Sequence, residues 1–140
     1  MRDVRKQIVK GLKAAIDAKA TGLTVYTKIP KGDATNPISY PYIYLTNIID
    51  SENGPKNQFM YNYDLDIEVV YKNLLDKVAM WDTVDKIKQI INNCEPFTID
   101  DNFKIMAMVL IDTDETEDLV DSQDVDVTRI RVNLDIEDNN

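Results

Sequence analysis

The chain has 140 residues, a formal net charge of −9 and no histidine. The lack of histidine excludes Ser-His-Asp and Cys-His nucleophile systems and histidine-ligated zinc sites, and it removes the commonest general base. A hydrophobic content of 44% with 29% charged residues predicts one packed globular domain with a single core.

Two further exclusions follow from the order of residues. No apolar run reaches the roughly 18 residues of a membrane span, and the charged N-terminus has no apolar signal core, so we expect a protein made without export. The single cysteine, Cys94, has no partner for an internal disulfide and is expected to be buried and inert.

The charge is unevenly distributed along the chain. Residues 1–32 carry eight basic and two acidic side chains, a balance of +6, and residues 33–140 carry a balance of −15. Such polarity favours head-to-tail attraction between copies. It makes a dedicated DNA-binding role improbable, because phosphate contacts need a net positive surface.

The first predicted element is a helix from a capping residue, Asp3, to about Ala20. Its apolar stripe has helical spacing and consists of Val4, Ile8, Leu12, Ala15 and Ile16. Another face carries Lys6, Lys10 and Lys13, which is either a solvated surface or an interface with an acidic neighbour.

Residues 23–29 predict a short strand, and residues 31–39 predict a loop rich in Gly, Asp, Asn and Pro. The stretch "YPYIYLTNII" at 40–49 predicts a second strand, with Pro41 at its first residue or on an edge. The Tyr40–Pro41 bond is a candidate for the cis form.

A turn at 51–57, which contains Asn53 and Gly54, precedes the clearest signal in the chain. In "FMYNYDLDIEVVY" at 59–71 every odd position is apolar or aromatic, which predicts a long strand with one packed and one wet face. The strands at 40–49 and 59–71 are expected to form a hairpin.

Residues 74–92 change to helical spacing and predict a second amphipathic helix across the sheet. Trp81 is expected to anchor the core, and an interface anchor is the alternative.

Residues 103–111 are apolar on both faces and predict a central strand. A last strand at 126–137 changes its apolar phase after Val127, for which we expect a bulge near Thr128. The order α-β-β-β-α-β-β predicts an α+β fold, a single domain with a mainly antiparallel sheet of four to five strands and two helices packed on one face.

The acidic run from Asp112 to Asp126 holds eight carboxylates and no basic residue. It opens like an EF-hand calcium loop, but Glu117 stands where the sixth position needs glycine, and Gln123 stands where the twelfth needs glutamate. An adventitious cation site is a second interpretation. A solvated, mobile hairpin loop between the last two strands is favoured over both.

Carboxylates at Asp64, Asp66 and Glu68 alternate along the wet face of a predicted strand, which is ordinary for an antiparallel sheet. No glycine-rich phosphate loop is present, since "PKGD" lacks the GK[ST] ending. We therefore predict no catalytic residue, no cofactor and no metal site, and a chain that is not an enzyme.

Taken in order, these segments resemble the tail completion, or tail terminator, proteins of long-tailed bacteriophages. The resemblance rests on a basic N-terminal helix, "VYTKIP", a loop into "YPYIYL", then "YDLDIEVVY", "AMWDTVDKIKQIIN", "FKIMAMVLI" and "TRIRVNLDI". It covers nearly the whole chain, 1–140, as one tail-terminator-like domain. The acidic segment 112–126 departs from the family pattern.

The resemblance implies a structural virion protein that is assembled in the bacterial cytoplasm. Such proteins form rings, commonly hexamers, at the head-proximal end of the tail, where they end tube growth and join the tail to the neck or capsid. The implied partners are further copies of the chain, the tail tube protein and neck or connector proteins. DNA passes through such a ring without specific binding, and no membrane is involved.

Candidate interface residues combine the basic helix face, the Tyr-Pro-Tyr strand start, the turn and the acidic run. They are Lys6, Lys10, Lys13, Tyr40, Pro41, Tyr42, Asn53, Gly54, Asp114, Glu115, Glu117 and Asp118. In this hypothesis Tyr-Pro-Tyr sets the angle at which the 31–39 loop leaves the sheet edge. Alternative functions are another neck component, such as a head-closure or connector protein, and an acidic inhibitor that mimics DNA.

Overall fold

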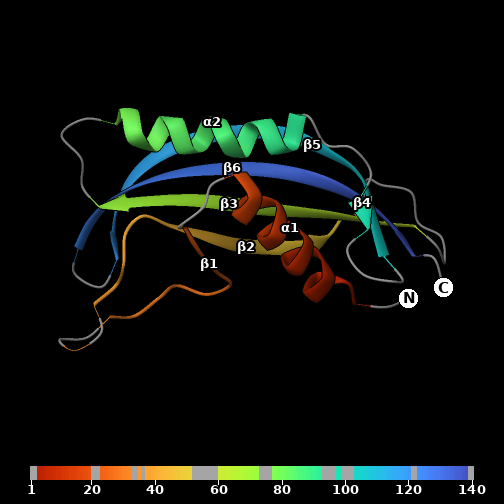
Figure 1. The fold of residues 1–140 in the computed structure, drawn as a ribbon, viewed down its shortest axis with the longest axis horizontal. Coiled ribbons are helices and arrows are strands. Elements are labelled where there is room, and N and C mark those ends of the chain that lie inside the picture. Colours follow the sequence, from red (N-terminus) through yellow and green to blue (C-terminus); the bar gives the residue numbers. More distant parts are fainter. Residues whose placement is uncertain are drawn as a thin grey trace.

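The computed structural model is an α+β fold with two helices and one sheet (Figure 1), as the sequence predicts. It describes residues 3–19, 23–32, 35, 37–51, 60–72, 77–92, 97–98, 103–120 and 123–138. Asn53, Gly54 and Cys94 lie outside these residues, so the predictions that fall on them are not placed. No described helix is both long and apolar enough to cross a membrane.

The elements follow the predicted order with one short addition. They are α1 (Arg5–Lys19), β1 (Thr24–Tyr26), β2 (Tyr42–Asp50), β3 (Met60–Lys72), α2 (Val78–Asn92), β4 (Phe97–Thr98), β5 (Phe103–Val120) and β6 (Gln123–Asp138). The sheet has the strand order β1-β2-β3-β6-β5-β4. All strand pairs are antiparallel except β1 with β2. The two-residue strand β4 is the addition to the predicted order.

Both helices cover the same face of the curved sheet (Figure 1). The core between them combines the apolar positions of α1 and α2 with the odd positions of β3 and the even positions of β6. Because β3 and β6 pair without a register shift, these apolar side chains form one continuous surface for the helices.

Helix α1 begins as predicted. The backbone N–H of Arg5 donates a 3.0 Å hydrogen bond to the Asp3 carboxylate, which satisfies one of the free donors of the first turn. The buried stripe of the helix contains Ile8, Leu12 and Ile16, and Lys6, Lys10 and Lys13 are exposed.

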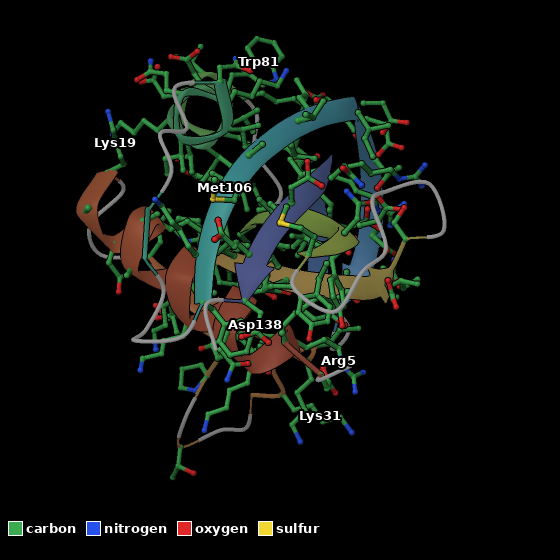
Figure 2. The ribbon with its side chains drawn as sticks, turned by 90° about the vertical axis from the view of Figure 1, so that its right-hand side faces the viewer. Arg5, Lys19, Lys31, Trp81, Met106 and Asp138 are labelled. Carbon is green, nitrogen blue, oxygen red and sulfur yellow. The ribbon has the colours of Figure 1, made fainter. Side chains whose placement is uncertain are left out.

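Helix α2 is amphipathic as predicted, but its buried stripe does not include Trp81. Its buried side chains are Met80, Thr83, Val84, Ile87 and Ile91. Trp81 is 51% exposed and lies on the outer side of the helix (Figure 2), so the expectation of a core anchor was wrong. A helical stripe that passes through Met80 leaves the adjacent position about 100° away, which directs Trp81 toward solvent.

The even positions of β3 were predicted to be exposed to solvent, and this prediction is only partly correct. Asn62 and Asp66 are buried. The Asn62 amide donates to Asn133 and Asp135 at 2.9 and 2.6 Å, and Asn133 donates to Asp64 at 2.8 Å. This outer face of the sheet is therefore a hydrogen-bonded polar layer, in which neighbouring side chains replace water.

The acidic segment is not a mobile loop. Residues 103–120 and 123–138 form one long β-hairpin, with partners that run from Phe103–Asp138 to Val120–Gln123. The segment is strand throughout its described part, so it does not form an EF-hand loop. Among the described residues β4 covers only Ile105 and Lys104 of β5, so β5 lies near the sheet edge and is not central, and Val109 and Ile111 are exposed.

The apolar phase change in β6 also has a different cause from the one expected. No bulge occurs near Thr128, because β6 pairs with β3 in unbroken register. Val125 and Val127 instead pack on the outer face with Tyr42 and Val70 in a second apolar cluster. The register shifts of the sheet lie in β5 and in β2, where Asn47 has a φ of 52°.

A pair of identical substitutions tests the assignment of the core. Leu65→Ala removes a side chain that is 1% exposed, so it should lower the free energy of unfolding by about 2–5 kcal/mol. Leu119→Ala removes a side chain that is 63% exposed and should change it by less than about 0.5 kcal/mol in dilute solution. Urea denaturation followed by circular dichroism measures both. Equal losses would contradict the assignment.

Candidate interaction surfaces

The distal part of the β5–β6 hairpin is an acidic ribbon, defined here as Asp112, Asp114, Glu115, Glu117, Asp118 and Asp124. All six residues are exposed. The strand register places Asp112 and Asp114 opposite Arg131 and Arg129, on the outer face of the sheet. Glu115 lies on the helix-covered face, opposite Thr128. The ribbon thus presents carboxylates on both of its faces.

Two arginines of β6 hold the outer carboxylates of β3 and β5 together. The Arg131 guanidinium lies 3.5 Å from Asp66 and 3.7 Å from Asp112. The Arg129 guanidinium lies 3.9 Å from Asp66 and 4.0 Å from Glu68. The Asn47 amide donates a further 2.8 Å hydrogen bond to Asp66. This charge network partly neutralises the outer face of the ribbon.

Glu68 belongs to this network and is partly buried beside Arg129. Burial raises the pKa of the Glu68 carboxyl; Arg129 lowers it, and Asp66, Asp118 and Asp114 raise it further. Desolvation therefore outweighs the attraction of the nearest cation at this position.

On the helix-covered face the ribbon contacts α2. The indole N–H of Trp81 donates to the Glu115 carboxylate at 2.5 Å, and the Lys77 ammonium lies 3.6 Å from the same carboxylate. The half-exposed indole, at the top of Figure 2, is therefore tethered to the ribbon by its polar edge while its apolar surface remains accessible.

The basic surface lies on α1, with Lys6, Lys10 and Lys13 exposed. At its N-terminal end, Arg5 and Asp3 form an ion pair of 2.6 Å. The hydrogen bonds from Arg5 lower the pKa of Asp3 to about 2. Between α1 and β2 is a groove of about 500 Å³ lined by Arg5, Lys6, Val9, Thr27, Leu45, Thr46, Asn47 and Ile48.

The Tyr-Pro-Tyr segment leads into β2; Tyr42, the first residue of the strand, is buried, and Tyr40 and Pro41 are partly buried. The Tyr40–Pro41 bond is cis, as anticipated, and the ring of Tyr42 lies 5.5 Å from each of the rings of Tyr40 and Tyr26. Tyr42 is only 1% exposed, and burial raises the pKa of its hydroxyl to about 12. Tyr42 can therefore support an interface only indirectly in this conformation.

The loop that precedes this segment forms a second hollow, of about 660 Å³. It is lined by Tyr26, Lys28, Ile29, Pro30, Lys31, Pro37 and Ile38. The two arms of the loop approach closely at Gly32, where an added Cβ would lie 2.6 Å from the backbone nitrogen of Ile38. Only glycine permits this approach without a backbone shift.

The predicted interface residues thus occupy three separate surfaces. The lysines lie on α1, Tyr40 and Pro41 lie at the start of β2, and the carboxylates lie on the ribbon. Sequence reasoning missed the exposed Leu119 and the groove between α1 and β2. An apolar residue inside a run of carboxylates was the available signal for Leu119. The groove has no such signal, because its walls are far apart in sequence. Among the described residues, no group of three or more His, Cys, Asp or Glu side chains is placed to hold a metal ion.

The geometry defines a class of protein: an α+β sheet with helices on one face and charged surfaces of opposite sign. A comparison with solved structures finds this fold in a chain described as "Virion of native gene transfer agent (GTA) particle". The match has a TM-score of 0.53 and 12% sequence identity, and covers 92% of this chain and 93% of the other. No protein-family model and no curated protein matches the sequence. At this identity the likeness is one of fold.

The raised pKa of Glu68 predicts a pH-dependent stability. Below its ordinary pKa of about 4.3 the carboxyl is protonated in both the folded and the unfolded state. As pH rises, the unfolded state ionises first, so the folded state loses stability through the folded pKa. Glu68→Gln removes this loss. Its stability relative to wild type should therefore increase as the pH rises above the ordinary carboxyl pKa of about 4.3 and through the raised folded pKa.

Urea titrations of both proteins at several pH values measure this difference. The same series for Glu117→Gln, an exposed ribbon position, corrects for the change in net charge. A stability difference that stays constant or falls with pH would show that the Arg129 attraction dominates at Glu68.

Proposed function

We propose that this chain is a structural subunit of a phage-like virion. It forms a ring at the head-proximal end of the tail, ends tube growth and joins the tail to the neck or capsid. The observation that carries the proposal is the fold likeness to a chain of a gene transfer agent virion over 92% of this sequence. The order of segments that resembles tail terminator proteins supports the same role independently.

The charge distribution fits assembly from identical copies. The exposed lysines of α1 and the acidic ribbon lie on different elements, so a basic surface of one copy can face an acidic surface of the next. A contact between two different surfaces is heterologous, and such contacts generate closed rings when the rotation between copies closes. In this proposal the ring is a hexamer, and it contains no reactive centre.

The net charge of −9 also suits a subunit beside a DNA channel. Carboxylates near the channel repel phosphates and prevent DNA from sticking, over a range of about 8–10 Å at physiological salt. The further partners in this proposal are the tail tube protein and neck proteins. The subunit then resides in the virion after assembly in the bacterial cytoplasm.

A different neck component would share these properties, and the tube test below separates the two roles. An acidic DNA mimic is less well supported, because Arg129 and Arg131 partly neutralise the outer carboxylates that such a mimic would present. A mimic would also need no contact between copies.

The tube test uses the tail tube protein of the same particle. Tubes polymerised in the presence of this chain should be shorter and should carry a ring at one end in negative-stain images. Unaltered tubes with free rings of this chain would favour another neck role. A monomer that neither forms rings nor binds tubes would contradict the proposal.

A charge reversal tests the basic surface. The triple variant with Lys6, Lys10 and Lys13 changed to Glu should lose self-association, because it removes the attraction to the ribbon. In the control, which has the same charge change, Lys72 of β3 and Lys86 and Lys88 of α2 are changed to Glu. This control should retain more of the self-association. Native mass spectrometry at low salt measures the oligomers, and circular dichroism verifies folding. Equal effects of both variants would show that only net charge matters.

A further inference from the structure

The tip of the acidic ribbon carries an exposed apolar side chain. Leu119 is 63% exposed, near the end of β5. It follows Glu117 and Asp118, and its register partner on β6 is Asp124. Contact with a partner would remove the apolar surface of Leu119 from water, which is favourable. The tip therefore presents one exposed apolar side chain surrounded by carboxylates.

The groove between α1 and β2 has the complementary character. Val9, Leu45 and Ile48 supply its apolar lining, and Lys6 supplies positive charge, whereas the charge of Arg5 is paired with Asp3. Its volume of about 500 Å³ accommodates a leucine side chain together with its neighbours. In the described part of the chain β1 pairs only with Tyr42–Tyr44, so β2 has no strand partner on that side beyond Tyr44.

The tip and the groove of one chain lie apart. Val125, next to the tip, pairs with Lys72 at one end of β3, whereas Leu45 and Thr46 of the groove pair with Ile67 and Asp66 in the middle of β3. Five to six steps along the strand separate these positions, about 17–20 Å at roughly 3.3 Å per residue. The groove also lies on the β2 side of the sheet, with β3 and β6 between β2 and β5. A tip therefore reaches a groove most directly on another copy.

We propose that Leu119 of one copy inserts into the groove between α1 and β2 of a second copy, with Glu117, which lies on the same strand face as Leu119, facing Lys6. The inference deepens the proposed function, since it names the contact that joins neighbouring subunits. Because the two surfaces differ, each copy can offer its tip to one neighbour and its groove to another. This is the condition for a ring of more than two subunits.

The hollow beside Lys28 and Lys31 fits this role less well. Its residue Ile38 packs against the cluster that contains Val125, so the hollow lies at the same end of the sheet as the tip. Two copies joined there can place each tip in the hollow of the other copy, and this two-fold pair ends assembly at a dimer. The groove lies opposite the middle of β3, away from the tip, so one copy can receive a tip and offer its own tip to a third copy.

Cysteine cross-linking of the full-length chain tests the contact. All variants carry Cys94→Ser, so that each has a single introduced thiol. Leu119→Cys and a mass-tagged Ile48→Cys are mixed and oxidised under mild conditions. The control mixes Ile111→Cys, which is 54% exposed on the same strand, with the same tagged variant. We expect about tenfold more mixed dimer from the first pair, because docking raises the local thiol concentration.

Adding Lys6→Glu to the Ile48→Cys variant should bring the yield close to that of the control. Mixed dimer at the control level would overturn the inference. So would cross-links of Leu119→Cys to itself in excess of the mixed product, which would indicate a two-fold tip contact.

The outcomes separate this inference from the proposed function. Rings in negative-stain images with control-level cross-linking leave the ring role intact and refute the tip-and-groove contact. Strong mixed cross-linking with open chains and no tube capping supports the contact and refutes the terminator role. The tube protein could protect the Ile48→Cys thiol in the groove when copies of this chain do not. That result would assign the groove to the tube protein and overturn the inference.

Discussion

The unbroken antiparallel pairing of β3 with β6 is the constraint on which the rest of the structure depends. Every residue from Met60 to Lys72 has a partner between Glu137 and Val125, without a register shift. Because side chains alternate along both strands, this pairing collects the main apolar core on one face, and the polar residues lie on the other together with the small cluster around Val70 and Val125. A shift by one residue would expose the core and bury the carboxylates. The helices and the charge network both rely on this register.

The alternation that creates this pairing was readable in the sequence, and the fold class and element order followed from it. What alternation does not specify is the environment of the polar face. Asn62 and Asp66 look like solvent-facing positions until β6 supplies Asn133, Arg129 and Arg131 beside them. Those partners lie about 70 residues away, so their proximity depends on strand order, which local pattern does not contain.

The errors at α2 and in the acidic segment have equally physical causes. Met80 and Trp81 both begin a stripe with helical spacing, and the choice between them is made by the sheet beneath the helix, where Glu115 accepts the indole N–H. The acidic segment has the composition of a loop, yet it forms strand. Val125 and Val127 anchor its partner strand in a buried cluster, and Arg131 offsets part of its repulsion at Asp112. Tertiary context overrides local propensity at both places.

The same electrostatics explains why the distal hairpin suits a contact between copies. Glu117 lies opposite Asp126 in the ladder, a pairing of like charges that costs stability in an antiparallel sheet. Arg131 reaches Asp112 on the proximal part of the ribbon, whereas Glu117 and Asp118 lie nearer the end of β5, opposite Asp126 and Val125. A cationic partner would relieve repulsion at the tip while it covers Leu119, so charge and apolar burial would favour the same docked geometry. The tip is then the part of the sheet that gains most from a neighbouring molecule.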